Sequence, residues 1–177
     1  MRKTSIILLT AILSTGYIVA QDWNSSLKLS IGTGYLSDAS FDDTPLITLE
    51  SAHSYKWLDL AYSLDYISSS GKYFDLSVNF KPKVDIIKIF TKDSNHSAKI
   101  GTGFGLGITS NKIYEWYEIP ASVRPDTKTL LFYKNSVMVS YEYQICNKTW
   151  AGAFFENYIS DVFFGKYYIG LSIRRDF

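Results

Sequence analysis

The chain has 177 residues, and its 18 Lys and Arg against 17 Asp and Glu give a formal net charge of +1. This length fits one domain, and the balanced charge excludes the clustered basic surface of a nucleic-acid-binding protein. The single cysteine, Cys146, excludes an internal disulfide and a cysteine-based zinc cluster. The 14 Tyr and 11 Phe suit a protein whose outer face meets something other than water.

Residues 1–20 follow the plan of a secretory signal peptide. A basic start precedes an apolar run over residues 6–13, and the small residue Ala20 ends the segment. The apolar run is too short for a membrane-spanning helix, which needs about 20 apolar residues. We therefore expect cleavage after Ala20 and an exported mature chain, residues 21–177, that forms one domain.

The mature chain alternates apolar and polar side chains with a period of two, which is typical of strands whose two faces meet different surroundings. Two weaker strands are expected near residues 46–53 and 149–158, and the mixed pattern of the second leaves its facing open. The clear strands are those over residues 27–35, 58–66, 74–81, 99–108, 137–145 and 167–176.

The face opposite the apolar one is rich in Gly, Ser and Ala as well as charge. A glycine row is a poor solvated surface but a good lining for a narrow interior, and the clearest row is Gly101, Gly103, Gly105 and Gly107. Apolar side chains outside, polar ones inside and aromatics at strand ends are the pattern of a transmembrane β-barrel. Only a closed barrel satisfies every peptide group of an antiparallel sheet in hydrocarbon. We therefore predict an all-β fold, a closed antiparallel eight-stranded transmembrane β-barrel.

An even number of strands places the start and the end of the barrel on the same, periplasmic side. The connections expected outside the cell lie at 38–44, 68–72, 110–134 and 160–166, and those on the periplasmic side at 54–56, 82–95 and 146–148. The longest connection is thus external. Residues 82–95 are long for a periplasmic turn, and we expect them either to form a short helix at the rim or to lengthen the fourth strand.

The outer connection at residues 112–134 is the most informative stretch for function. Two β-prone arms flank a turn-rich segment at 120–126, which predicts a long outer hairpin between strands five and six. A ten-stranded barrel, with both arms crossing the membrane, is disfavoured because each arm is short for a span. Exposed apolar patches mark contact sites. The aromatic side chains that we predict to bind an extracellular protein or surface ligand are Tyr114, Trp116, Tyr117, Phe132 and Tyr133. Alternatively, the arms pack on each other over the barrel mouth.

The predicted interior carries charges that form either an ion pathway or a paired polar core. The residues concerned are Lys28, Glu50, Asp59, Asp65, Asp75, Lys99, Glu142 and Arg174. An eight-stranded barrel has an interior only wide enough for its own side chains, and a buried charge without a partner is costly. We therefore predict a paired polar core.

The two histidines, His53 and His96, invite a catalytic or metal-binding interpretation. Both are expected at the periplasmic ends of their strands, and two histidines without a nearby Cys or paired carboxylate make a poor metal site. We therefore predict no catalytic residue, metal or cofactor, and expect each histidine to have a local structural partner.

The last residues carry a family resemblance. The last residue is aromatic and falls on the same, outward face of the final strand as the apolar side chains before it. The residues on this face are Tyr167, Ile169, Leu171, Ile173 and Phe177. This pattern resembles the C-terminal assembly signal of Gram-negative outer-membrane β-barrels. With the signal peptide and eight strands, the mature chain resembles the small eight-stranded outer-membrane barrel family. Arg175 departs from the pattern, but it lies beside the periplasmic end and can extend into the interface.

The resemblance implies location in the cell outer membrane, contact with outer-membrane lipid and with the barrel-assembly machinery, and a structural or surface-interaction role. Some small outer-membrane barrels that this chain resembles are lipid A acylases or deacylases, which gives an alternative function. That chemistry needs a histidine with a serine or carboxylate at the outer rim. Both histidines of this chain are expected at the opposite end.

Overall fold

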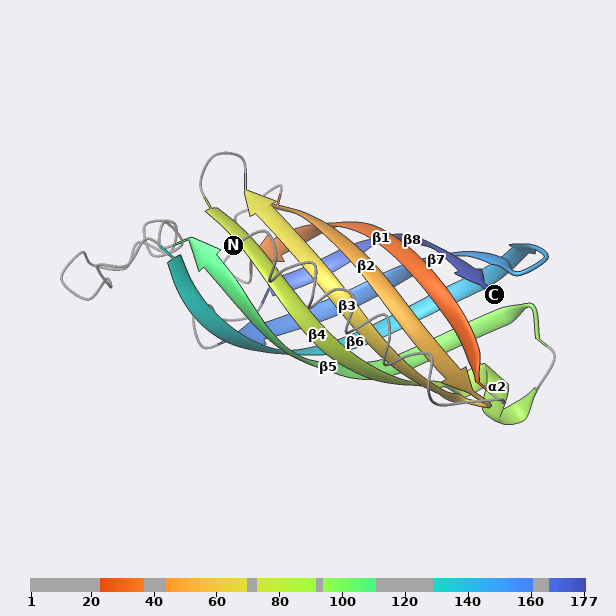
Figure 1. Ribbon diagram of the computed structural model, residues 1–177. Coiled ribbons are helices and arrows are strands. Elements are labelled where there is room, and N and C mark those ends of the chain that lie inside the picture. The colour runs from red at the N-terminus through yellow and green to blue at the C-terminus, as the bar shows by residue number, and fades with distance from the viewer. Residues whose placement is uncertain (1–22, 37–43, 70–72, 92–93, 111–128, 161–165) are drawn as a thin grey trace.

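The protein is an eight-stranded barrel in which every strand pairs antiparallel with its neighbours in the sequence, and the last strand closes on the first (Figure 1). The computed structural model describes residues 23–36, 44–69, 73–91, 94–110, 129–160 and 166–177. The elements are β1 (Asn24–Leu36), β2 (Thr44–Tyr55), β3 (Leu58–Ser69), β4 (Tyr73–Asp85), α2 (Ile86–Phe90), β5 (His96–Ser110), β6 (Thr129–Cys146), β7 (Thr149–Ser160) and β8 (Lys166–Asp176). The predicted fold class is confirmed.

The period-two pattern sets which side chains face the interior. In the six clear strands the apolar positions point outward, as predicted, and the small and charged positions are buried inside. The facing of β7, which the sequence left open, is settled by Phe154, Glu156 and Tyr158, which point inward, while Phe155 and Ile159 are exposed outside. Three interior positions of β7, Trp150, Phe154 and Tyr158, carry aromatic rings, and this explains the mixed pattern of the strand.

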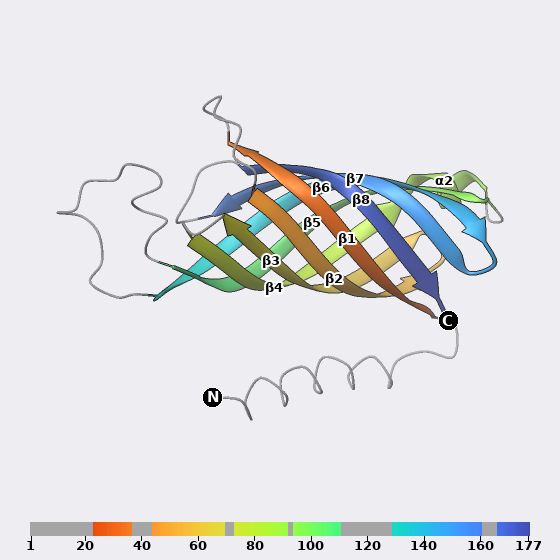
Figure 2. The same ribbon diagram turned by 90° about the horizontal axis from the view of Figure 1, so that it is seen from above.

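The two ends of the barrel differ in their connections. β1 begins where β8 ends, with Ser26 opposite Asp176 in the register, and Figure 2 shows these two strands side by side. We call this the terminal end. Its two hairpin turns are tight, and Lys56 and Lys148 adopt positive φ angles of 54° and 61° there, as short hairpin turns require. The opposite end, which we call the loop end, carries the longest connection, residues 111–128, whereas the connection that contains α2, residues 86–95, lies at the terminal end.

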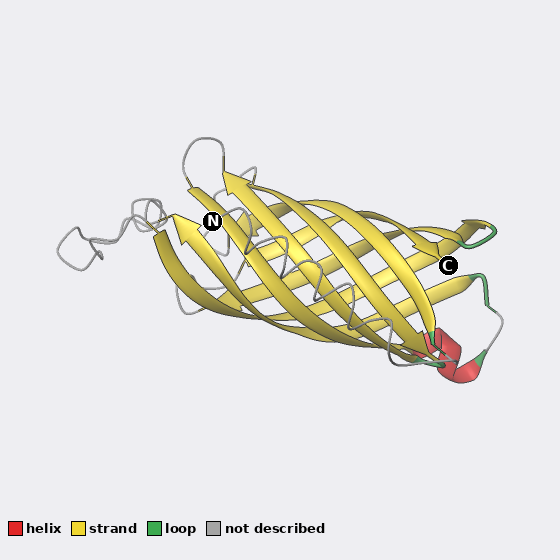
Figure 3. Cartoon of the chain, in the orientation of Figure 1, coloured by secondary structure: helices red, strands yellow, loops and turns green. Residues whose placement is uncertain are grey.

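The segment between β4 and β5 realises both predicted alternatives. β4 continues through Pro82 to Asp85, and α2 follows directly (Figure 3). The Asp85 carboxylate caps the helix by accepting a hydrogen bond of 3.2 Å from the backbone N–H of Lys88. The Asp85 N–H in turn donates to the carbonyl of Trp57 at 2.8 Å. The β2–β3 turn and the start of α2 are thereby held together.

The predicted outer hairpin needs a correction at Phe132. β5 and β6 stay paired up to Ser110 opposite Thr129, whereas the pairing of β6 with β7 begins only at Lys134 opposite Ser160, so residues 129–133 continue the β5–β6 pair beyond the described end of β7. Phe132 is only 2% exposed and points inward, so its predicted exposure for partner binding was wrong. The inward phase of β6 continues through this position, and Gly107 leaves the space, since a Cβ there would lie 2.6 Å from the Phe132 ring.

Tyr133, next in the chain, points outward and is 46% exposed. The remaining predicted partner-binding residues, Tyr114, Trp116 and Tyr117, lie outside the described residues. So does the predicted signal peptide.

Candidate functional site

The barrel interior is a charged core whose formal charges balance. Among the described residues, seven Lys and Arg side chains and seven carboxylates are buried. The cations are Lys28, Lys81, Lys83, Lys99, Lys134, Lys166 and Arg174, and the carboxylates are Glu50, Asp59, Asp65, Asp75, Asp85, Glu142 and Glu156. Burial of so many charges is tolerable only with pairing.

A first cluster lies toward the loop end around Asp65. One oxygen of this carboxylate accepts hydrogen bonds from Lys134 at 3.0 Å, from Lys81 at 3.2 Å and from the Tyr158 hydroxyl at 2.9 Å. Lys81 also pairs with Glu156 at 3.0 Å, and the Lys134 ammonium lies 3.9 Å from the centre of the Tyr158 ring. The cluster links β3, β4, β6 and β7 across the barrel.

A second cluster lies toward the terminal end around Glu142. Its carboxylate is 2.9 Å from the Lys28 ammonium, 3.1 Å from the Arg174 guanidinium and 3.8 Å from the Lys99 ammonium. Lys99 also pairs with Asp59. β6 therefore supplies one carboxylate that three cations from β1, β5 and β8 share.

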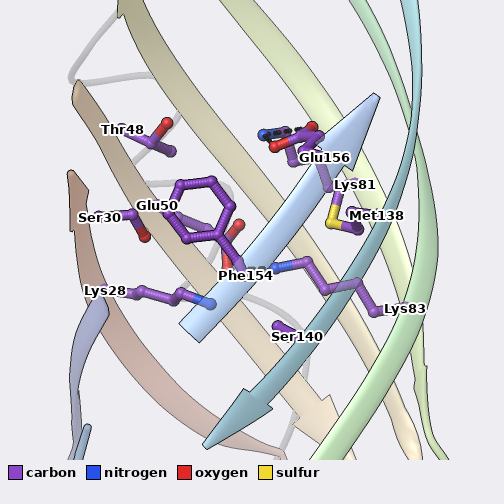
Figure 4. Close-up of a pocket in the computed structure, with 10 residues that line it drawn as sticks. All are labelled: Lys28, Ser30, Thr48, Glu50, Lys81, Lys83, Met138, Ser140, Phe154 and Glu156. Carbon is purple, nitrogen blue, oxygen red and sulfur yellow. Dashed lines mark hydrogen bonds and ion pairs between the residues drawn. The ribbon is translucent and has the colours of Figure 1, made fainter. Parts of the chain in front are cut away.

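Between the clusters, Lys83 of β4 pairs with Glu50 of β2. Figure 4 shows this pair beside the Phe154 ring and Met138, which occupy the middle of the interior. The free space there is a cavity of about 20 Å³, which is room for about one water molecule. The described interior thus contains the predicted paired polar core, except that the buried carboxylate of Asp75 has no ion-pair partner among the described residues.

The predicted list of interior charges lacks six that the structure buries, among them Lys83, Lys134 and Glu156. Lys83 and Lys134 lie on parts of β4 and β6 that extend beyond the strands predicted from the alternation. Glu156 lies on β7, whose inward face the sequence pattern did not assign. Continuing the inward phase of β4 past Pro82 would have found Lys83 and Asp85.

The glycine row of β5 makes room for these long side chains. A Cβ at Gly101 would lie 2.7 Å from Cγ of Lys83, and one at Gly103 would lie 2.3 Å from Oγ of Ser136. Ser136 in turn donates a 2.7 Å hydrogen bond to Glu156. The row therefore faces crowded neighbours, as predicted for a narrow interior.

Both histidines lie near the terminal end and contact hydroxyl groups. Nδ1 of His53 is 3.1 Å from Oγ of Ser25, and Nδ1 of His96 is 2.5 Å from the Tyr141 hydroxyl. Within the described part of the chain, no three His, Cys, Asp or Glu side chains are placed to hold a metal ion. No described helix is long and apolar enough to span a membrane.

The outer wall is apolar along its length and aromatic near its ends. Exposed apolar side chains on this wall include Leu29, Ile31, Leu49, Leu64, Phe104, Leu106, Val137, Val139, Ile169 and Leu171. Near the terminal end, the rings of Trp23 and Tyr55 stack at 5.6 Å. Arg175 reaches the β6–β7 turn there, where its guanidinium donates to the Asn147 carbonyl at 2.9 Å. An apolar wall around a charged core defines a transmembrane β-barrel.

Comparisons with solved structures agree with this class. The N-terminal β-barrel domain of Pseudomonas aeruginosa OprF is similar with a TM-score of 0.61 at 12% identity, over 87% of this chain and 98% of that one. Neisserial surface protein A is similar with a TM-score of 0.61 at 9% identity, over 89% of this chain and 98% of that one. No protein-family model and no curated protein sequence matches the chain. The fold is that of small eight-stranded outer-membrane barrels, which confirms the predicted resemblance.

Proposed function

We propose that the protein is an integral barrel of the cell outer membrane with a structural or surface-interaction role. The observation that carries this proposal is the inside-out arrangement of the barrel, with apolar side chains exposed on the wall and, among the described residues, fourteen charged side chains buried inside. Such a wall is stable in hydrocarbon and would aggregate in water. Its partners in this role are the outer-membrane lipids.

The terminal end lies in the periplasm and the loop end outside the cell. Short turns on the periplasmic side and longer external connections are the rule for bacterial outer-membrane barrels. The tight turns at Lys56 and Lys148 lie at the terminal end, and the longest connection, residues 111–128, leaves the barrel at the loop end.

The surface-interaction role belongs to the external connection between β5 and β6. At its base, Leu131 and Tyr133 are exposed on the outward face of β6, and Tyr114, Trp116 and Tyr117 follow within the connection itself. Aromatic side chains of this kind are frequent anchors in binding interfaces. The partner is an extracellular protein or a surface ligand.

Protease added to intact cells tests both the orientation and the interaction. We expect cleavage to be confined to external connections, with residues 111–128 cut and residues 86–95 protected. Replacing residues 120–126 by a short Asn-Gly turn should leave the barrel folded, since loop tips tolerate such changes. Removing Tyr114, Trp116 and Tyr117 should abolish surface binding. A cut near α2 with residues 111–128 intact would reverse the proposed orientation.

The alternative function, an outer-leaflet lipid A acyl-modifying enzyme, needs a catalytic histidine at the outer rim. His53 and His96 lie near the terminal end, and their ring nitrogens contact the Ser25 and Tyr141 hydroxyls. This placement favours the structural or surface-interaction role.

We also propose that β8 carries the signal read by the barrel-assembly machinery. Ile169, Leu171, Ile173 and Phe177 are exposed on the outer wall, in the phase that the resemblance requires. Deleting Phe177 should lower the yield of folded barrel at least several-fold, whereas Phe177→Tyr should keep it. Heat-modifiable gel migration of outer-membrane fractions measures the yield, and equal yields from the deletion and the parent would contradict the signal.

A further inference from the structure

We propose that α2 and the adjoining β2–β3 turn form a lipid-binding foot that lies in the headgroup region of the periplasmic leaflet. The foot consists of Tyr55, Trp57, Ile86, Ile89 and Phe90. Its occupant is membrane phospholipid, and the inference rests on the proposed membrane location and orientation of the barrel.

The first argument is exposure. Phe90 is 84% exposed and Ile89 is 50% exposed, and α2 contains no buried residue. A helix of five residues is far too short to be stable by itself in water, and its apolar face is not covered by the described part of the protein. The Asp85 cap fixes where the helix begins, but a cap does not shield apolar side chains.

The second argument is continuity with the lipid-facing wall. Val84 is the last outward residue of β4, and it lies between Leu58 and Ile100 on the outer faces of the neighbouring strands. The foot begins two residues further on, and the Asp85–Trp57 hydrogen bond holds the aromatic turn beside it. Figures 1 and 2 show α2 at the margin of the barrel at its terminal end. The apolar wall thus runs directly into the foot.

The third argument is the polar boundary of the foot. Lys88 is on α2, yet it lines a cavity of about 210 Å³ at the barrel mouth, and its ammonium is 4.0 Å from the Asp85 carboxylate. The Lys56 ammonium lies 5.0 Å from the centre of the Tyr55 ring. Apolar side chains on one side, with Lys, Tyr and Trp at the edge, are the composition of segments that lie in the headgroup region of a bilayer.

An environment-sensitive fluorophore on single cysteines tests the foot. Phe90→Cys and Ile89→Cys are made in a Cys146→Ser background, labelled with a nitrobenzoxadiazole dye and reconstituted as the full barrel into phosphatidylethanolamine–phosphatidylglycerol vesicles. Leu171→Cys in the same background is the membrane control, because Leu171 is 72% exposed on the wall. The parent protein labelled at its native, exposed Cys146 is the water control.

We expect the dyes at positions 89 and 90 to emit at shorter wavelength than the dye at Cys146. We also expect dissolved iodide to quench their fluorescence less than that of the dye at Cys146. Lipids with the quenching doxyl group at carbon 5 should quench them more than lipids carrying it at carbon 12, while the dye at 171 should show the reverse order. If iodide quenches the dyes at positions 89 and 90 as strongly as the dye at Cys146, and doxyl lipids do not quench them, the proposed lipid-binding foot is wrong. If the dye at 171 also escapes doxyl quenching, the proposed membrane location itself fails.

Discussion

Glu142→Gln is expected to lower the free energy of unfolding of the barrel by about 3–5 kcal/mol, the range for breaking a buried ion pair from one side. The side chain of Glu142 is 1% exposed and lies within 4 Å of the Lys28, Lys99 and Arg174 charges. The substitution keeps the shape of the side chain, so the loss comes from leaving three cations without their shared anion. Urea unfolding in lipid vesicles, followed by tryptophan fluorescence, measures the difference.

Two further variants separate charge balance from general damage. Lys28→Gln combined with Glu142→Gln restores the formal balance and should recover part of the lost stability, because Lys28 is the nearest of the three cations. Lys148→Gln removes a charge from an exposed turn and should change stability by no more than about 0.5 kcal/mol. A Glu142→Gln barrel as stable as the parent would show that the cluster does not depend on this carboxylate.

The charged core shows how far alternation alone predicts an interior. The alternation predicts an inward position for four of these charges, because each lies on a strand with a clear period of two: Glu142, Asp59, Lys99 and Arg174. The pattern gives the direction of each side chain but not its partner, because partners come from opposite walls. Lys81 and Glu156, for example, are 75 residues apart in the sequence. Which cation meets which anion depends on the stagger of the closed sheet, which the alternation does not encode.

The start of β6 shows where the local pattern misleads. The run around Phe132 and Tyr133 is apolar and aromatic on both faces, so its composition does not tell which of the two side chains is buried. In the structure the Phe132 ring points inward, into the space left by the missing side chain of Gly107 on β5. That complementarity lies between strands and cannot be read from either strand alone. Tyr114, Trp116 and Tyr117 lie beyond the described residues, and their binding role stays a prediction.

Close contact between strands also underlies the second large effect on stability that we predict. It concerns the seam where β8 pairs with β1 and closes the barrel. Gly170 of β8 is paired with Gly32 of β1, and a Cβ at Gly170 would lie 2.2 Å from the Ile31 carbonyl oxygen and 2.5 Å from the Gly32 Cα. Both atoms are backbone, so no side-chain rotation relieves the overlap and the two strands must separate. Gly170→Ala should therefore cost about 3 kcal/mol, the upper part of the range for overpacking.

Matched substitutions on the same seam decide whether closure is what Gly170→Ala damages. At Gly32 a Cβ would lie 2.9 Å from the Ile169 carbonyl oxygen, so Gly32→Ala should cost less than Gly170→Ala. Ser172→Ala, at the next inward position of β8, removes an atom instead of adding one and should stay within about 0.5 kcal/mol of the parent. Urea midpoints in vesicles should follow this order, with Gly170→Ala unfolding first. If Gly170→Ala and Ser172→Ala have the same urea midpoint, the seam can accommodate the added methyl group. Close contact between β1 and β8 would then not be required for the closed barrel to be stable.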